Sequence, residues 1–311
     1  MPIDIALLGC AHPHVSDVLG VIASEPDVRL VASWDADPAA IPAAISGTAV
    51  ARAETAISRA NAVVICAPTD QRPALAVTAA RAGAPVLIEK PIARTAAEAR
   101  LVARELARTR TPVLPALHLR ELPALSRLRG VVRERLLGRL TSIRASQAHA
   151  GLLEGWFRGP TSWMRDPARA GVGGFGDLGL DLVDAVGLLG RDEPVLLGAV
   201  VLDHDGTGEV GGTALGSFAG VPLTIHTSWA ERPGGLEIVV AGSSGTATLR
   251  DGVLELARST GSPERWVGGP PDAGEAMRAF AGRLRARRVP TDVLAAAVEA
   301  QAVVERAMRV G

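Results

Sequence analysis

Tyrosine is absent from this 311-residue chain, and aromatic residues make up only 3% of it. No tyrosine can therefore act as a general acid, which excludes mechanisms that need one. The two cysteines, Cys10 and Cys66, follow or lie in apolar runs and form neither a disulfide framework nor a zinc-binding spacing. We interpret both as small buried thiols.

Net charge and long hydrophobic runs are also lacking. Acidic and basic residues balance at 33 each, so charge gives no argument for nucleic acid or an anionic membrane as a partner. No stretch reaches transmembrane length without charge, and the N-terminal run around Asp4 lacks the basic region of a signal peptide. The apolar fraction of 48% can fill a substantial core. We therefore expect a cytoplasmic protein.

The first part of the chain alternates apolar, strand-like runs with helical stretches. Strands are predicted over residues 3–8, 28–34, 62–67, 85–88 and 112–115, and helices over 15–24, 73–82 and 95–108. Thr95 and Glu98 have the spacing of a capping box at the start of the last of these helices. Strands that alternate with helices at this spacing predict βαβ units and a doubly wound parallel sheet.

The pattern changes after about residue 120, where strand-like runs follow one another with short turns between them. After a helix over 122–136, strands are predicted over 140–150, 195–202, 213–218, 222–229, 236–241, 246–250 and 253–257, and two helices over 274–285 and 291–309 close the chain. Strands in series predict a large, mainly antiparallel open sheet. The fold class is therefore α/β followed by α+β.

The loop after the first strand is a candidate nucleotide site. It reads Gly9-Cys10-Ala11-His12-Pro13-His14, where a dinucleotide-binding loop has G-x-G-x-x-G. Alanine at the second glycine position adds only a methyl group, whereas histidine at the third is a larger change. Backbone N–H groups and a helix N-terminus at this place can hold a pyrophosphate.

Asp35 ends the second predicted strand, 26 residues after Gly9 (35 − 9). A carboxylate at this position can bind both hydroxyls of the adenosine ribose and would repel a 2′-phosphate, which favours NAD over NADP. The structural alternative is that Asp35 only caps a turn with Asp37-Pro38.

The H-x-H of His12 and His14 admits a second interpretation, as part of a metal site. Zinc needs three or four protein ligands, and the remaining histidines lie in no recognisable ligand pair: His118, His149, His204 and His226. The second half of the chain also lacks the periodicity of a (β/α)₈ barrel. The sequence therefore predicts no metal, and leaves loop packing or a contact of His12 with the cofactor as alternatives.

The most specific stretch is "VLIEKPIART", residues 86–95, in which Glu89-Lys90-Pro91 follows a predicted strand. It is accompanied by "APTDQR" at 67–72, "HLRELPAL" at 118–125, "GRLTSIRA" at 138–145 and "WMRDPARAGVGGFGDLGLDLVD" at 163–184. Together these motifs resemble the Gfo/Idh/MocA family of oxidoreductases over essentially the whole chain. The resemblance implies an NAD-binding Rossmann domain, residues 1–119, and an α+β substrate-binding and oligomerisation domain, residues 120–311.

The resemblance also implies roles for individual residues. Lys90 matches the family lysine that lies between the nicotinamide and the substrate hydroxyl, where an amine can exchange a proton with an alcohol or ketone oxygen. The expected cofactor contacts are Gly9, Ala11, His12, His14, Asp35, Ala67, Pro68, Thr69, Arg72, Glu89, Lys90 and His118. The expected substrate contacts are Trp163, Arg165, Asp177 and Asp181.

Asp177 and Asp181 are four residues apart on a predicted helix and therefore share a face. Asp177 matches the family aspartate that binds substrate hydroxyls, and Asp181 stands where the family usually has its catalytic histidine. With Lys90 they would form an acid–base cluster, in which Asp181 acts as a proton-transfer group or as a substrate ligand. The structural alternative is a simple amphipathic helix with Asp181 and Asp184 on its solvated face.

These residues predict a hydride transfer between NAD and a hydroxyl or keto carbon of a sugar, amino sugar or cyclitol, with Lys90 as acid–base group. A redox-neutral enzyme that retains its NAD (an epimerase, eliminase or glycosidase) and a non-catalytic dinucleotide-binding sensor are the alternatives. The family resemblance implies a homodimer or homotetramer, formed through the open face of the second-domain sheet.

Overall fold

The computed structural model describes residues 2–203 and 206–310, and the chain divides by contacts into two compact units. The first unit comprises Met1–Ala116, Trp156–Gly171 and Ala273–Glu299, and the second Leu117–Gly155, Val172–Asp272 and Ala300–Gly311. Each unit thus collects segments that are distant in the sequence. The boundary between residues 119 and 120 stays a prediction. His204, one of the histidines counted above, lies outside the described residues.

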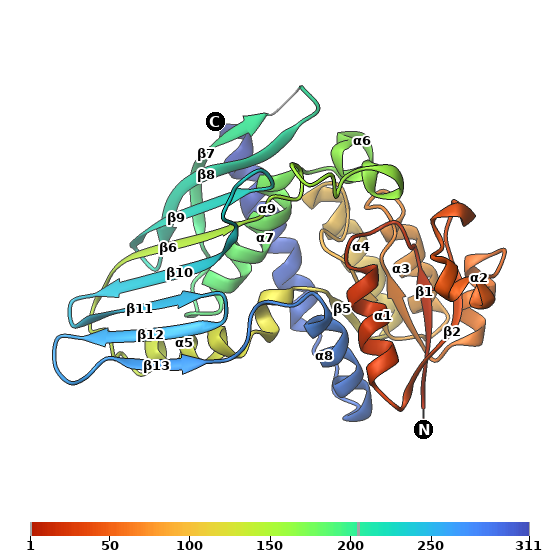
Figure 1. Cartoon of the computed structure of the whole chain (residues 1–311), viewed down its shortest axis with the longest axis horizontal. Coiled ribbons are helices and arrows are strands. Elements are labelled where there is room, and N and C mark those ends of the chain that lie inside the picture. Colours follow the sequence, from red (N-terminus) through yellow and green to blue (C-terminus); the bar gives the residue numbers. More distant parts are fainter. Residues whose placement is uncertain (1, 204–205, 311) are drawn as a thin grey trace. The chain divides into compact units, whose positions relative to one another are not determined.

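The first unit contains a five-stranded parallel sheet (Figure 1). Its strands are β1 (Ile3–Leu8), β2 (Val28–Trp34), β3 (Ala62–Ile65), β4 (Val86–Ile88) and β5 (Val113–Pro115), in the spatial order β2-β1-β3-β4-β5. Strands β3, β4 and β5 are buried throughout, as expected of parallel strands covered on both faces. The strand order reverses between β1 and β3, and ligands of such sheets bind at the carboxyl ends of the strands beside this point.

Helices lie on both faces of this sheet. The helices of the first unit are α1 (Val15–Ser24), α2 (Ala53–Arg59), α3 (Arg72–Arg81), α4 (Ala96–Thr109), α6 (Pro167–Ala170) and α8 (Gly274–Arg285). Helices α1 and α8 pack together on one face, and α3 and α4 on the other (Figure 1). The hydroxyl of Thr95 accepts a hydrogen bond from the backbone N–H of Glu98 at 3.1 Å, so the predicted N-cap is confirmed.

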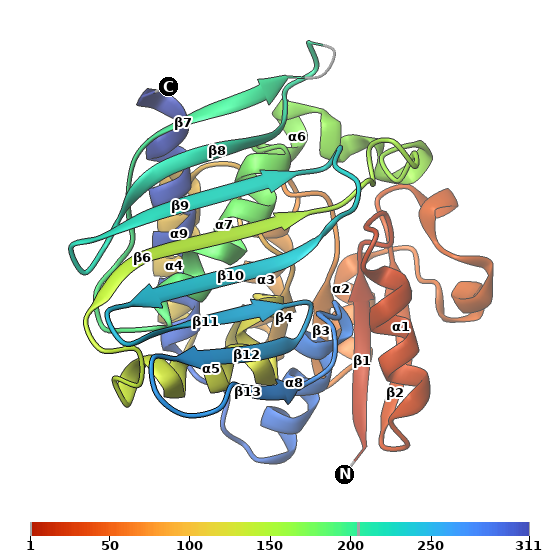
Figure 2. The same ribbon diagram turned by 60° about the vertical axis from the view of Figure 1, so that its left-hand side comes forward.

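The second unit contains an eight-stranded sheet, drawn nearly face-on in Figure 2. In spatial order its strands are β13 (Glu264–Val267), β12 (Val253–Arg258), β11 (Gly245–Arg250), β10 (Gly235–Gly242), β6 (Leu140–Ala148), β9 (Val221–Ser228), β8 (Glu209–Phe218) and β7 (Val195–Asp203). Only β6 and β9 pair in parallel within this sheet. The predicted fold class, a doubly wound parallel sheet and a mainly antiparallel open sheet, is therefore confirmed.

Two helices of the second unit cover one face of its sheet (Figure 2). Helix α7 (Gly174–Gly187) packs on β6, β8 and β9, and α5 (Pro123–Arg133) packs on β11 and β12. The last helix, α9 (Asp292–Val310), begins in the first unit and ends in the second. Among the described residues, no helix is long and apolar enough to cross a lipid bilayer.

Candidate functional site

The tight turn after β1 requires glycine at position 9. Gly9 has φ = +86°, a left-handed conformation that other residues rarely adopt. A Cβ atom at this position would lie 2.2 Å from the backbone nitrogen and Cα of Ala67, in the loop after β3. The loops after β1 and β3 therefore touch each other at the point where the strand order reverses, which is the usual place of a dinucleotide in this topology.

Asp35 lies at the end of β2 and is buried, with 7% of its surface exposed. Its carboxylate accepts hydrogen bonds from the backbone N–H groups of Cys10 at 2.6 Å and Asp37 at 2.9 Å. The first of these bonds places the carboxylate against the Gly9 loop, and the second shows that Asp35 also caps the turn before Pro38. Each carboxylate oxygen retains acceptor capacity, so ribose hydroxyls can bind without displacing either N–H group.

Arg72 and Trp163 hold the loops of this region in place. Arg72 is fully buried and donates hydrogen bonds of 2.8 Å to the carbonyls of Ala67 and Pro91, so it joins the loop after β3 to the turn after β4. Its guanidinium lies 5.4 Å from the centre of the Trp163 ring. The Trp163 indole N–H in turn donates to the carbonyl of Ala11. Both side chains thus form the framework of the candidate nucleotide site.

The Glu89-Lys90-Pro91 motif follows β4, and both charged residues have only 3% of their surface exposed. Glu89 Oε1 lies 3.1 Å from Nδ1 of His14, the residue at the N-cap of α1. The motif and the Gly9 loop are therefore in contact although 75 residues separate the two side chains. The carboxyl ends of β1, β3 and β4 thus bring together most residues predicted to bind the cofactor: Gly9, Ala11, His12, His14, Ala67, Pro68, Thr69, Arg72, Glu89 and Lys90.

Thr69 provides an observation that fits a bound dinucleotide. It is 1% exposed and lies in the loop after β3, four residues beyond the end of that strand. Its hydroxyl has no hydrogen-bond partner among the described residues. Because a buried polar group without a partner is costly, a polar ligand group such as the nicotinamide amide or ribose would stabilise this hydroxyl.

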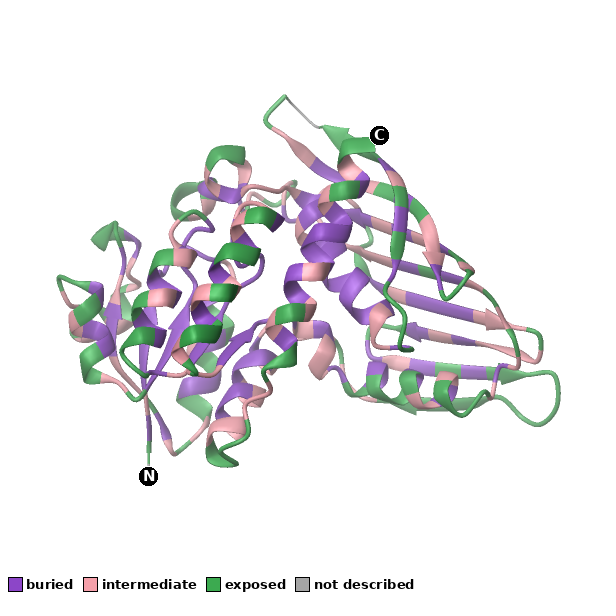
Figure 3. Ribbon diagram, turned by 180° about the vertical axis from the view of Figure 1, so that it is seen from behind, coloured by how far each residue is buried: buried purple, intermediate pink, exposed green. Residues whose placement is uncertain are grey.

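The second unit carries the aspartates of α7, which is buried along almost its whole length (Figure 3). Asp181 and Asp184 are 3% and 5% exposed, so the interpretation of a solvated face is wrong. The Arg120 guanidinium binds both oxygens of Asp184, at 2.6 and 2.7 Å. Burial raises the pKa of the Asp184 carboxyl, and this ion pair acts against the rise. Asp177 is half-buried and accepts a hydrogen bond of 3.3 Å from the Trp229 indole.

The two remaining predicted site residues lie at the ends of 3₁₀ helices. His118 begins the 3₁₀ helix His118–Glu121 in the second unit, and Arg165 ends the 3₁₀ helix Gly159–Arg165 in the first. Both are half-buried. They belong to different units, as do Lys90 and Asp177.

Glu209, on β8, is a half-buried acid that the sequence pattern does not reveal. Its carboxylate accepts hydrogen bonds from the backbone N–H groups of Gly173, Phe175 and Gly176 at 2.6, 2.6 and 3.2 Å. It thus caps the N-terminus of α7, the helix that carries Asp177. Burial raises the pKa of Glu209 from 4.5 to about 7 despite these bonds. Glu209 and Gly173 are 36 positions apart in the sequence, so no local motif reveals this contact.

The raised pKa of Glu209 predicts a specific pH dependence of stability. The folded state binds the proton more tightly than the unfolded chain, so this stabilisation is present below pH 4.5 and is lost as the pH rises through about 7. For this group alone the free energy of unfolding should fall by about 3 kcal/mol over that range. Urea unfolding of Glu209→Gln should show a flatter pH profile than wild type. The exposed Glu193→Gln serves as control, and equal profiles for wild type and Glu209→Gln would contradict the assignment.

Comparisons with known proteins agree with this geometry. Residues 3–116 match the Gfo/Idh/MocA family, described as an oxidoreductase family with an NAD-binding Rossmann fold. The levoglucosan dehydrogenase of Pseudarthrobacter phenanthrenivorans is 28% identical over 127 residues, 40% of this chain and 31% of that protein. The chain thus covers about a third of the length of this relative.

Two solved structures share the fold over almost the entire chain. An oxidoreductase domain protein from Kribbella flavida superposes with a TM-score of 0.84 at 20% identity, over 98% of this chain and 96% of the other. An inositol dehydrogenase homolog from Azotobacter vinelandii, solved with NAD⁺, gives 0.83 at 18% identity, over 100% and 95%.

The N-terminal unit thus has a Rossmann fold. Residues 3–116 match the model of the Gfo/Idh/MocA oxidoreductase family, in agreement with the resemblance inferred from the motifs in this part of the chain. The matching family is described as oxidoreductases with an NAD-binding fold, and the Azotobacter vinelandii homolog was solved with NAD⁺, which agrees with the expected oxidoreductase class and the expected cofactor.

Proposed function

We propose that this chain is an NAD-dependent dehydrogenase or reductase. It transfers a hydride between the nicotinamide and a hydroxyl or keto carbon of a sugar, amino sugar or cyclitol. Lys90 carries the proposal, because it is a buried amine in the turn after β4, beside the loops that meet at Gly9. The substrate class is supported by relatives named levoglucosan dehydrogenase and inositol dehydrogenase homolog.

The composition of the chain also singles out Lys90. Of the 33 lysine and arginine residues, Lys90 is the only lysine. Arginine keeps its proton under all ordinary conditions, whereas a lysine amine can give up and take back a proton. The chain therefore uses its only exchangeable basic amine at the turn where the proposed reaction needs one.

The residues of the first unit have distinct tasks in the proposed reaction. Bound NAD supplies the hydride acceptor or donor. Gly9 and Ala11 let the backbone approach the pyrophosphate, Asp35 binds the ribose hydroxyls, and Thr69 binds the nicotinamide end. As the substrate alcohol is oxidised, Lys90 Nζ takes the hydroxyl proton, and in the reverse direction it returns that proton to the ketone oxygen.

Further parts of the proposal concern the second unit. Asp177 and Asp181 are proposed to bind substrate hydroxyls, with Arg165, Trp163 and His118 as further contacts. A homodimer or homotetramer is proposed through the face of the sheet that faces away from α7. Leu215 and Val200 on this face are 62% and 80% exposed, which is costly for a monomer in water. We also propose that the protein is located in the cytoplasm.

The direct test of the proposed function is a turnover assay that follows the nicotinamide absorbance with NAD⁺ and a panel of sugars, amino sugars and cyclitols. We expect reduction of NAD⁺ with at least one polyol. If bound NAD stays unchanged while a sugar is converted, the redox-neutral alternative is correct instead. Binding of NAD without turnover of any member of the panel would favour the sensor.

Asp35 should set the preference for NADH over NADPH. In Asp35→Asn the side chain can still accept the Cys10 N–H but has lost its charge, so repulsion of a 2′-phosphate disappears. We expect NADH binding to weaken by about tenfold and the preference over NADPH to be largely lost. Asp37→Asn is the matched control, because Asp37 caps the 3₁₀ helix Pro38–Ala40 through Ala39 N–H. An unchanged NADH preference in Asp35→Asn, measured by fluorescence titration, would contradict the assignment.

A further inference from the structure

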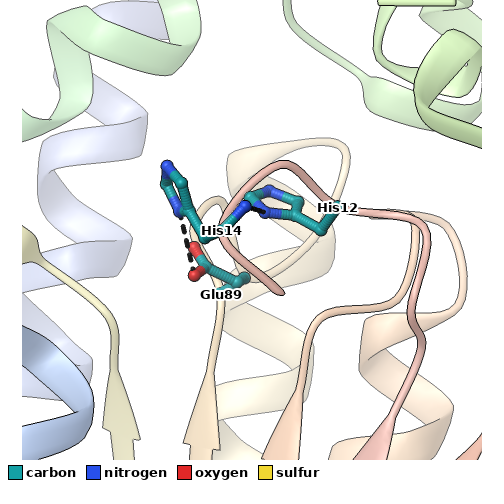
Figure 4. Close-up of side chains that lie close together, drawn as sticks. All are labelled: His12, His14 and Glu89. Carbon is teal, nitrogen blue, oxygen red and sulfur yellow. Dashed lines mark hydrogen bonds and ion pairs between the residues drawn. The ribbon is translucent and has the colours of Figure 1, made fainter. Parts of the chain in front are cut away.

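Three side chains with metal-binding atoms converge at the carboxyl ends of β1 and β4. His12 and His14 come from the loop after β1 and Glu89 from the turn after β4, and one ligand atom of each lies within 4.8 Å of the other two (Figure 4). We call these three residues the His12–His14–Glu89 cluster. All three lie in the first unit, so its geometry is independent of the placement of the second.

The cluster is held by its surroundings rather than by flexible side chains. The rings of His12 and His14 contact each other edge to face, with centroids 4.7 Å apart. The Trp163 ring lies 5.9 Å from His12, and His12 Nδ1 accepts the backbone N–H of His14 at 3.2 Å. His12 and Glu89 are 6% and 3% exposed. A site assembled in advance loses little conformational entropy when a ligand binds.

The ligand types and spacing fit a divalent transition metal. Two imidazoles and one carboxylate are a common protein ligand set for zinc, and such sets leave a fourth position open. His14 Nδ1 and Glu89 Oε1 are 3.1 Å apart, close to the separation of about 3.3 Å between two ligands of one tetrahedral zinc ion. Magnesium and calcium prefer all-oxygen sites and fit this set poorly.

Charged side chains near the cluster also affect how strongly it would bind a cation. Glu89 supplies the negative charge, while Arg72 and Lys90 lie close enough to act on His12 electrostatically. A neutral imidazole has one acceptor nitrogen, so a metal bound at His12 Nδ1 would replace the backbone N–H of His14 as its partner.

We propose that His12, His14 and Glu89 form a binding site for one divalent transition-metal ion, zinc by ligand type, with the fourth position open to water or a substrate oxygen. Two of its three residues, His12 and His14, lie in the proposed cofactor loop, and the third, Glu89, directly precedes Lys90 in the sequence. The proposal does not depend on the dehydrogenase assignment, since it rests on the three side chains alone.

The test measures metal directly, without nucleotide or substrate. The full chain is stripped with a chelator, loaded with Co²⁺ or Zn²⁺, and passed through a desalting column. We expect one metal ion per chain by elemental analysis and the intense visible absorption of tetrahedral Co²⁺. His14→Ala and Glu89→Gln should each weaken zinc binding by about tenfold to a hundredfold in a chelator competition.

The chain offers a matched control for this experiment. His226 Nε2 lies 2.8 Å from Glu231 Oε2, so His226→Ala removes another histidine with a carboxylate partner, from a half-exposed pair in the second unit. This variant should bind metal as wild type does. His14→Ala is the primary variant, because the His14 side chain is 27% exposed and the fold should tolerate its loss. Circular dichroism checks that the variant is folded.

Two results would overturn the proposal. One is a loaded wild-type protein without stoichiometric metal, and the other is wild-type zinc affinity in His14→Ala. NADH titration of the chelator-treated protein is recorded separately. A protein that binds NADH but no metal refutes only the metal site, and one that binds metal but no NADH refutes only the proposed function.

Discussion

Replacing Lys90 with methionine is expected to lower kcat by about 10²–10⁴-fold, the range typical of a lost proton-transfer group. Methionine fills a similar volume in a position that is only 3% exposed, so fold and NADH binding should persist. The measurement is steady-state kinetics with the best polyol found in the panel. An NADH titration of the same variant then separates an effect on catalysis from an effect on cofactor binding.

Lys90→Arg distinguishes proton transfer from a simple effect of charge. Arginine keeps the positive charge at position 90 but holds its proton, so it cannot take the proton of a hydroxyl group. We expect Lys90→Arg to lose as much activity as Lys90→Met. An arginine variant with near wild-type kcat would show that Lys90 acts through its charge alone, and the acid–base role would be wrong.

Gly9→Ala is expected to lower the free energy of unfolding by about 4 kcal/mol or more, at the extreme of single-site effects. The new Cβ would lie 2.2 Å from backbone atoms of Ala67, and alanine is strained at φ = +86°. Since relief requires the loops after β1 and β3 to separate, NADH binding should be lost together with stability. Chemical denaturation and NADH titration measure the two effects.

Gly20→Ala is the matched control for this substitution. Gly20 lies on the exposed side of α1, and no atom outside its own helix turn lies within 4 Å of an added Cβ. Alanine there should raise the free energy of unfolding by up to about 1 kcal/mol, because glycine is a poor helix former. A Gly9→Ala protein as stable as Gly20→Ala would contradict the close approach of the two loops.

Much of the fold is predictable because its elements are apolar runs with clear ends. The bounds of β1, α1, β2 and α8 agree with the sequence prediction residue for residue. Strand β1 is an almost continuous buried run, and α1 and α8 each bury one helical face, whereas β2 is an apolar run with a mixed burial pattern. By contrast, β13 has four exposed residues and no alternation, so the sequence gives no sign of this edge strand. The sequence pattern also does not predict the seven-residue helix α2, because only three of its residues are buried and they form a short apolar face.

The candidate site, like the fold, is only partly predictable from the sequence. The Gly9 turn, Asp35 and the Glu89-Lys90 motif are visible in the sequence, because strand ends of a parallel sheet gather at one edge. The partners of these residues are not visible. Arg120 binds Asp184 across 64 positions and His14 contacts Glu89 across 75, and both pairings depend on the order of strands and helices in space.

Glu89 explains why the sequence alone predicts no metal site. The histidines offer too few ligands, since His118, His149 and His226 form no recognisable pair with the H-x-H. The third ligand atom of the proposed site is a carboxylate oxygen of the Glu89-Lys90-Pro91 motif, to which the sequence assigns a role at the cofactor. A search for histidine ligands alone therefore does not reveal this cluster, because one of its three members is a glutamate.

The measurement that tests the central claim most directly is a calorimetric titration of the purified chain with NADH. The account predicts saturable binding of one NADH per chain, its loss in Gly9→Ala, and weaker binding of NADPH. Absence of saturable binding for both nucleotides in the folded wild-type protein would contradict the account. The Gly9 loop, Asp35 and Thr69 would then be a Rossmann framework without a dinucleotide.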